Sequence, residues 1–235
     1  ENGGYTGAPK FMMPNNLDFL LHYATATSDT ELMKYVDTTL TRMARGGVFD
    51  PVGGGFSRYS VDEKWHVPHF EKMLYDNGQL VSLYAKAYAV TKNPVYKKVV
   101  EKTIAFVVEE LQDENGGFYS SLDADSMNEA GELEEGAFYV WQSSELEKLL
   151  GNDFSIFKEY FNINSYGLWE ENKYVLIQTE TAKAIAEKQG ITAQALEAKI
   201  EKALAVLKSQ RSQRSKPRLD HKILTSWNGL LHNGL

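Results

Sequence analysis

The sequence contains no cysteine, no long apolar run and no surplus of positive charge. Without cysteine, the chain has no disulfide, no thiolate zinc site and no cysteine nucleophile. No stretch of about 18 apolar residues occurs, so the sequence predicts no transmembrane helix. The chain has 25 basic and 32 acidic residues, a formal net charge of -7. This balance argues against broad binding to nucleic acid or to acidic membranes, because both require a cationic surface.

The residues that are present predict one globular domain over 1–235. Hydrophobic residues make up 43% of the 235 positions and aromatic residues 12%, which is enough for a large core. A Gly-Gly-aromatic turn recurs beside long amphipathic helices at Gly3-Gly4-Tyr5, Gly54-Gly55-Phe56 and Gly116-Gly117-Phe118. This recurrence is typical of a ring of helical hairpins whose loops gather at one mouth. The chain begins inside a motif and ends inside a helix start, so we expect it to be a segment of a longer protein.

Hydrophobic periodicity and capping residues give the expected elements. Pro68 is expected at the first turn of its helix, where its missing backbone donor is not needed. The basic cluster from Lys208 to Arg218 is read mostly as a solvated helix end. The expected helices span residues 15–27, 28–43, 68–91, 93–111 and 192–211, with a further short helix that begins at 144–147 and ends at Gly151. Strands are expected near 117–119, 137–141 and 172–178.

The stretch from Gly53 to Asn77 is the richest in reactive side chains, and it offers His66, His69 and Asp76 as candidate catalytic residues. A histidine in a first helical turn stays neutral, because unpaired backbone donors disfavour a positive charge there, and a general base must be neutral. A structural role for His69 and a metal site using both histidines are the alternatives. Residues expected to grip a ligand in this stretch are Arg58, Tyr59, Trp65 and Glu71.

Two further segments carry candidate residues. Asp123 and Asp125 alternate in an extended segment, so their carboxylates point the same way, as an acid and base for sugar chemistry would require. Loop capping and calcium binding are the competing interpretations. Near the end of the sequence, Asp220, Trp227 and Asn228 offer a carboxylate, an aromatic platform and an amide, which suit a sugar ring, although Asp220 is equally suited to capping a loop.

Long motifs resemble one known family. These motifs are Gly3 to Phe11, Gly53 to Asn77, Gly116 to Ser126, Glu135 to Trp141 and Asp220 to Gly229. They resemble thioredoxin-domain-containing proteins of the YyaL and spermatogenesis-associated type, in which a thioredoxin-like domain precedes an all-α toroid of six helical hairpins. Met12 and His221 depart from the family pattern.

The resemblance implies a partial (α/α) toroid, similar to six-hairpin glycosidases and N-acylglucosamine 2-epimerases, with short β-hairpins in its mouth loops. It implies a carbohydrate-active domain that binds a sugar or sugar derivative, of sugar epimerase or glycoside hydrolase type. The alternative is a non-catalytic binding or scaffold domain that serves an attached thioredoxin-like domain. We expect no cofactor, metal, nucleic acid or membrane partner, and a cytoplasmic location.

Overall fold

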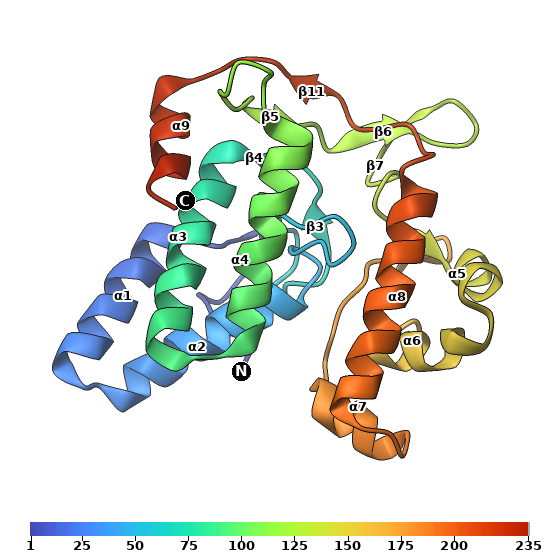
Figure 1. Ribbon diagram of the computed structural model, residues 1–235, viewed down its shortest axis with the longest axis horizontal. Helices are drawn as coiled ribbons and strands as arrows, with labels where there is room; N and C mark the ends of the chain where they lie inside the picture. Colours follow the sequence, from blue (N-terminus) through green and yellow to red (C-terminus); the bar gives the residue numbers. More distant parts are fainter. Residues whose placement is uncertain (235) are drawn as a thin grey trace.

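The computed structural model describes residues 1–234 and consists mainly of helices joined by loops that carry short antiparallel strands (Figure 1). We call α1–α4 together with α9 the first lobe, and α5–α8 the second lobe. The first lobe contains α1 (Pro14–Thr27), α2 (Thr30–Arg45), α3 (Leu74–Thr91), α4 (Pro94–Phe106) and α9 (Thr225–His232). The second lobe contains α5 (Ser143–Leu150), α6 (Phe154–Tyr160), α7 (Ala182–Lys188) and α8 (Ala193–Arg211).

Apolar stripes on the helices form a separate core in each lobe. In the first lobe, Leu40, Tyr84 and Tyr96 are buried among α1, α2, α3 and α4. In the second, Phe157 and Leu207 belong to a core built from α5 to α8. Helix α3 lies centrally in its lobe, because it packs against α1, α4 and α9.

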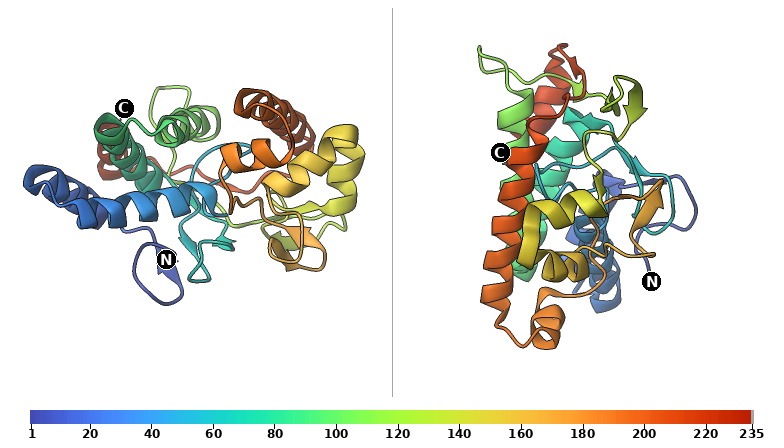
Figure 2. Two further views of the ribbon diagram at one scale, coloured as in Figure 1. Left: turned by 90° about the horizontal axis from the view of Figure 1, so that it is seen from below. Right: turned by 90° about the vertical axis from the view of Figure 1, so that its right-hand side faces the viewer.

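The strands are two or three residues long and form four small antiparallel groups. In both views of Figure 2 the strands near residues 59–69 and 168–174 lie on the same side of the long helices. The groups are β1 (Lys10–Phe11) with β2 (Tyr59–Ser60) and β3 (Pro68–His69); β4 (Lys72–Met73) with β5 (Ser121–Leu122) and β11 (Leu219–Asp220); β6 (Asp125–Met127) with β7 (Leu133–Glu135); and β8 (Trp141–Gln142) with β10 (Lys173–Tyr174) and β9 (Leu168–Glu170).

Several expected elements are confirmed. Helix α1 ends at Thr27, and α4 begins at Pro94 after Asn93, whose side chain accepts a hydrogen bond from the backbone N–H of Val95 (3.1 Å). Helix α8 follows its cap Thr192. A π-helical turn (Val107–Leu111) extends α4 to the expected end near residue 111, and a 3-10 turn (Gly151–Asp153) joins α5 to α6.

Other expectations are wrong. Pro68 lies in β3, and α3 begins only at Leu74, because residues 68–73 pair with β2 and β5. The hairpin of the acidic loop is formed by β6 and β7. Of the flanking aromatic pieces, Phe118 forms only an isolated bridge with Gln112, and Trp141 begins β8, which pairs with β10. The expected strand at 172–178 is limited to β10. Within the described chain, no helix combines the length and apolar character needed to cross a membrane.

Candidate active site

His69 lies in β3, where its ring stacks on Tyr59, its partner across the β2–β3 pair, with ring centres 4.9 Å apart. The Nδ1 atom of His69 is 2.7 Å from Oε1 of Glu135 in β7, and Nε2 is 3.9 Å from Oε2 of Glu71. A carboxylate beside Nδ1 favours the tautomer that carries its proton there and leaves the Nε2 lone pair free. His69 therefore does not lie in the first turn of a helix, contrary to the prediction, and its contact with Glu135 fixes the orientation of its ring.

Arg58 connects this histidine region to the start of α3. Its Nη1 donates to Oε2 of Glu71 at 3.2 Å, while its backbone N–H donates to the Glu71 carbonyl at 2.9 Å. Tyr75 lies against the same guanidinium. Among residues 1–234, the Nε atom of Arg58 is buried without a hydrogen-bond partner. Arg58 therefore retains an unused donor within the cluster.

Asp76 occupies the first turn of α3 and is only 8% exposed. Its Oδ2 atom is another buried atom that lacks a partner within the described residues. Burial raises the pKa of Asp76 to about 7, Arg58 opposes this shift and Glu71 adds to it. The carboxyl group therefore exchanges a proton near neutral pH, which is the property of a catalytic acid.

The alternating aspartates have different surroundings. Asp125 lies directly opposite Glu135 in the β6–β7 pair, which places it beside the partner of His69. The carboxylate of Asp123 is 2.8 Å from Nη2 of Arg218. Asp220 pairs with Lys222 at 2.8 Å and lies opposite Ser121 in the β5–β11 pair. Only Asp125 thus joins the histidine cluster through a neighbouring residue.

Three other candidates, Trp65, His66 and Asn228, have side chains that contact backbone groups of the protein. Trp65 is fully buried, and its indole N–H donates to the Asn2 carbonyl at 3.0 Å, so its ring is not available to a ligand. The Nε2 atom of His66 is 3.2 Å from the Gly167 carbonyl oxygen. The side chain of Asn228 bonds the backbone N–H of Phe118 at 2.9 Å and its carbonyl at 3.0 Å, so its amide holds the chain at Phe118.

The ring of Trp227, also expected to grip a ligand, contacts Tyr75 edge to face at 4.8 Å. It is partly buried and packs against the core formed by the start of α3 and the end of α4. Its position beside Tyr75 brings it to the same helix start as Asp76.

Sequence reasoning missed Glu135 as a member of the cluster. The sequence does contain one feature that marks the position of Glu135, namely the glycine that follows it. Gly136 has φ of 75°, and a Cβ there would lie 2.5 Å from a ring carbon of Phe70. The tight turn therefore requires glycine, and it directs β7 toward His69.

Known proteins resemble this chain over its whole length. Spermatogenesis-associated protein 20 of Homo sapiens is 36% identical across 100% of the chain, and an uncharacterized protein of Caenorhabditis elegans is 35% identical across 99%. The chain spans about a third of these relatives, 33% and 35% of their lengths. No family model matches. A sugar epimerase from a ruminal bacterium has a TM-score of 0.47 and 13% identity, with coverage of 94% of this chain and 71% of that structure.

Proposed function

We propose that this chain forms part of a carbohydrate-active domain whose site contains His69, Glu135, Glu71, Arg58 and Asp76. The observation that carries the proposal is the contact series from Glu135 through His69 and Glu71 to Arg58, with a buried Asp76 whose pKa is about 7. An oriented imidazole beside an acid that titrates near neutrality is suited to moving protons. The neighbouring carboxylates and guanidinium suit the hydroxyl groups of a sugar.

In the proposed reaction, Nε2 of His69 removes a proton from the sugar and the carboxylic acid of Asp76 supplies one. When both transfers occur at the same carbon on opposite faces, the product is an epimer and no atom is gained or lost. In the glycosidic alternative, protonated Asp76 donates to the leaving oxygen while a carboxylate such as Asp125 activates water. Product mass distinguishes the two reactions, because only epimerisation conserves the mass of the substrate.

We also propose that α1, α3 and α9 are inner helices of an (α/α)6 toroid. A repeated contact supports this: Asn77 in α3 bonds both backbone groups of Phe56, and Asn228 in α9 bonds both backbone groups of Phe118. Each phenylalanine ends a Gly-Gly-Phe turn. The same local structure at two helices that pack side by side is typical of tandem repeats.

The test uses the complete natural protein and a panel of sugars. A binding sugar is identified by thermal shift, and its conversion is followed by chromatography and mass spectrometry. His69→Asn should lower kcat/KM by about 100-fold or more, because it removes the base. His22→Asn, which changes an exposed side chain of α1, is the matched control and should leave turnover unchanged. Equal turnover in the wild type and His69→Asn would contradict the catalytic proposal, and retained cellular function without any sugar binding would favour a scaffold.

A further inference from the structure

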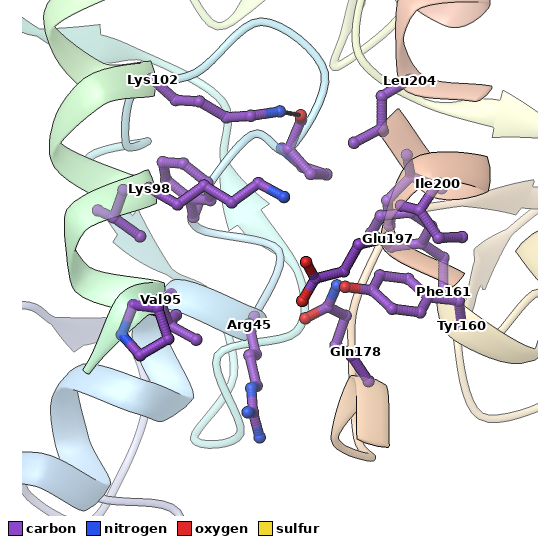
Figure 3. A pocket seen from close by; sticks show the side chains of 18 residues that line it. Arg45, Val95, Lys98, Lys102, Tyr160, Phe161, Gln178, Glu197, Ile200 and Leu204 are labelled. Atoms are coloured by element: carbon purple, nitrogen blue, oxygen red, sulfur yellow. Dashed lines mark hydrogen bonds between the residues drawn. The ribbon is translucent and has the colours of Figure 1, made fainter. Parts of the chain in front are cut away.

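A pocket lies between the two lobes and contains none of the site residues described above. Its volume is about 210 Å³. Val95 and Lys98 line it from α4, while Glu197 and Ile200 line it from α8 (Figure 3). Arg45, at the end of α2, lies at its lower edge (Figure 3). The pocket therefore opens where helices of both lobes face one another.

The charged side chains of this pocket differ in how far they are neutralised. Lys98 forms an ion pair with Glu201, and Lys102 donates to the Pro51 carbonyl at 2.7 Å. Within residues 1–234, Arg45 and Glu197 line the pocket without forming a salt bridge. The two lining charges without an ion-pair partner are thus one cation, on the half-buried Arg45, and one anion, on the exposed Glu197.

Polar and apolar groups complete the pocket. The backbone N–H of Gln178 donates to the Arg45 carbonyl at 2.8 Å, which fixes the second lobe against the end of α2. The Gln178 side chain lies beside the Tyr160 hydroxyl, and Figure 3 shows both directed toward the region of Glu197. Val99 and Ile200, each 3% exposed, form apolar walls on opposite sides. The lining thus combines both signs of charge with apolar surface.

We propose that this pocket binds a free α-amino acid with an apolar side chain. The ligand carboxylate pairs with Arg45, its ammonium group pairs with Glu197, and its side chain packs between Val99 and Ile200. A simple anion would use only Arg45, and a hydrocarbon would use neither charge. The volume of the pocket also fits this ligand. An apolar cavity of about 150 Å³ accommodates benzene, so this larger pocket has room for an aromatic ring together with the ammonium and carboxylate groups of an amino acid.

The test measures the binding of L-phenylalanine to the complete protein by calorimetry and thermal shift. Phenylacetate, which lacks the ammonium group, and phenethylamine, which lacks the carboxylate, are the matched ligands. Phenylalanine should bind about tenfold more tightly than either, because each charged hydrogen bond is typically worth that much or more. It should also raise the melting temperature, since it binds only the folded state.

Arg45→Gln and Glu197→Gln should each weaken phenylalanine binding by about tenfold or more. Glu197→Gln should not weaken phenylacetate binding, because that ligand has no ammonium group. Lys97→Gln and Glu187→Gln are matched controls at exposed positions whose ion pairs lie within their own helices, and both should bind like the wild type. Circular dichroism verifies that each variant is folded. Absence of phenylalanine binding, equal binding of the three ligands, or unchanged binding by both pocket variants would overturn the proposal.

Discussion

At the scale of single residues, Asp76 combines burial, a missing partner and a raised pKa. Sequence reasoning named it as a candidate in the stretch from Gly53 to Asn77, and an aspartate within an apolar helix face is costly unless it is bonded or lines a pocket. The structure places its Oδ2 atom in a buried position without a partner in the described chain. What the sequence could not reveal is the neighbour that modulates it, because Arg58 lies on the preceding loop and approaches through strand pairing.

Asp76→Asn should stabilise the fold, and the gain should increase with pH. The folded pKa of about 7 exceeds the ordinary value of 3.8, so between these values the unfolded chain loses its proton while the folded chain keeps it. Wild-type stability therefore falls from pH 4 to pH 7 relative to the variant, by at most about 4 kcal/mol. Urea unfolding at pH 5 and pH 8 measures the difference. Asp29→Asn, which retains the cap of α2, is the control, and a less stable Asp76→Asn at pH 8 would disprove the prediction.

Glu135 is a positioning residue in the proposed reaction, because it touches His69 and holds its ring. Glu135→Gln keeps an acceptor for the Nδ1 proton, whereas Glu135→Ala removes it. We expect the alanine variant to lose about tenfold or more in kcat, and the glutamine variant to retain more activity with a similar KM. Steady-state kinetics with the sugar identified by the binding screen provides the measurement. Equal losses in both variants would show that hydrogen bonding to His69 is unimportant.

At the scale of elements, local signals located helix ends where the cap itself is local. Asn93-Pro94 and Thr192 mark true starts, because their side chains act within two or three residues. The start of α3 was misplaced because residues 68–73 form strands with partners outside their own segment, β2 and β5. Two-residue strands depend on such tertiary pairing, and periodicity does not reveal them.

Asn77→Ala should cost more stability than Asn228→Ala. The Asn77 side chain is fully buried, and it accepts from the Phe56 N–H at 2.7 Å and donates to the Phe56 and Met73 carbonyls. Its loss leaves these groups without partners in a dry core, at a cost of about 2–4 kcal/mol. Asn228 makes the equivalent bonds at a partly solvated position, so water compensates for part of the loss. Thermal and urea unfolding of both variants measures the order, and a reversed order would contradict the prediction.

At the scale of the whole molecule, a buried ion triad joins the lobes. Asp50, in the loop after α2, accepts two hydrogen bonds from Arg211 at 3.0 and 2.8 Å and one from Lys72 at 2.9 Å. Arg211 ends α8 and is 5% exposed, so interpreting the basic cluster there as a solvated helix end is wrong for this residue. Its partner is 161 residues away in sequence, which is why composition and local periodicity gave no sign of the contact.

Asp50→Asn should destabilise the protein by about 3–5 kcal/mol, because it leaves two buried cations without their counter-ion. Burial alone would raise the pKa of Asp50, but Arg211 and Lys72 hold it well below its ordinary range. The stabilisation by this carboxylate is therefore complete above about pH 4 and is lost as pH falls further, so wild-type and variant stabilities should converge in acid. Urea unfolding at pH 7 and acid titration followed by circular dichroism measure both effects.

Lys216→Met, which removes an exposed ion pair with Glu110, is the control and should cost less than about 1 kcal/mol. If Asp50→Asn were as mild as this control, the triad could not be what fixes the two lobes together.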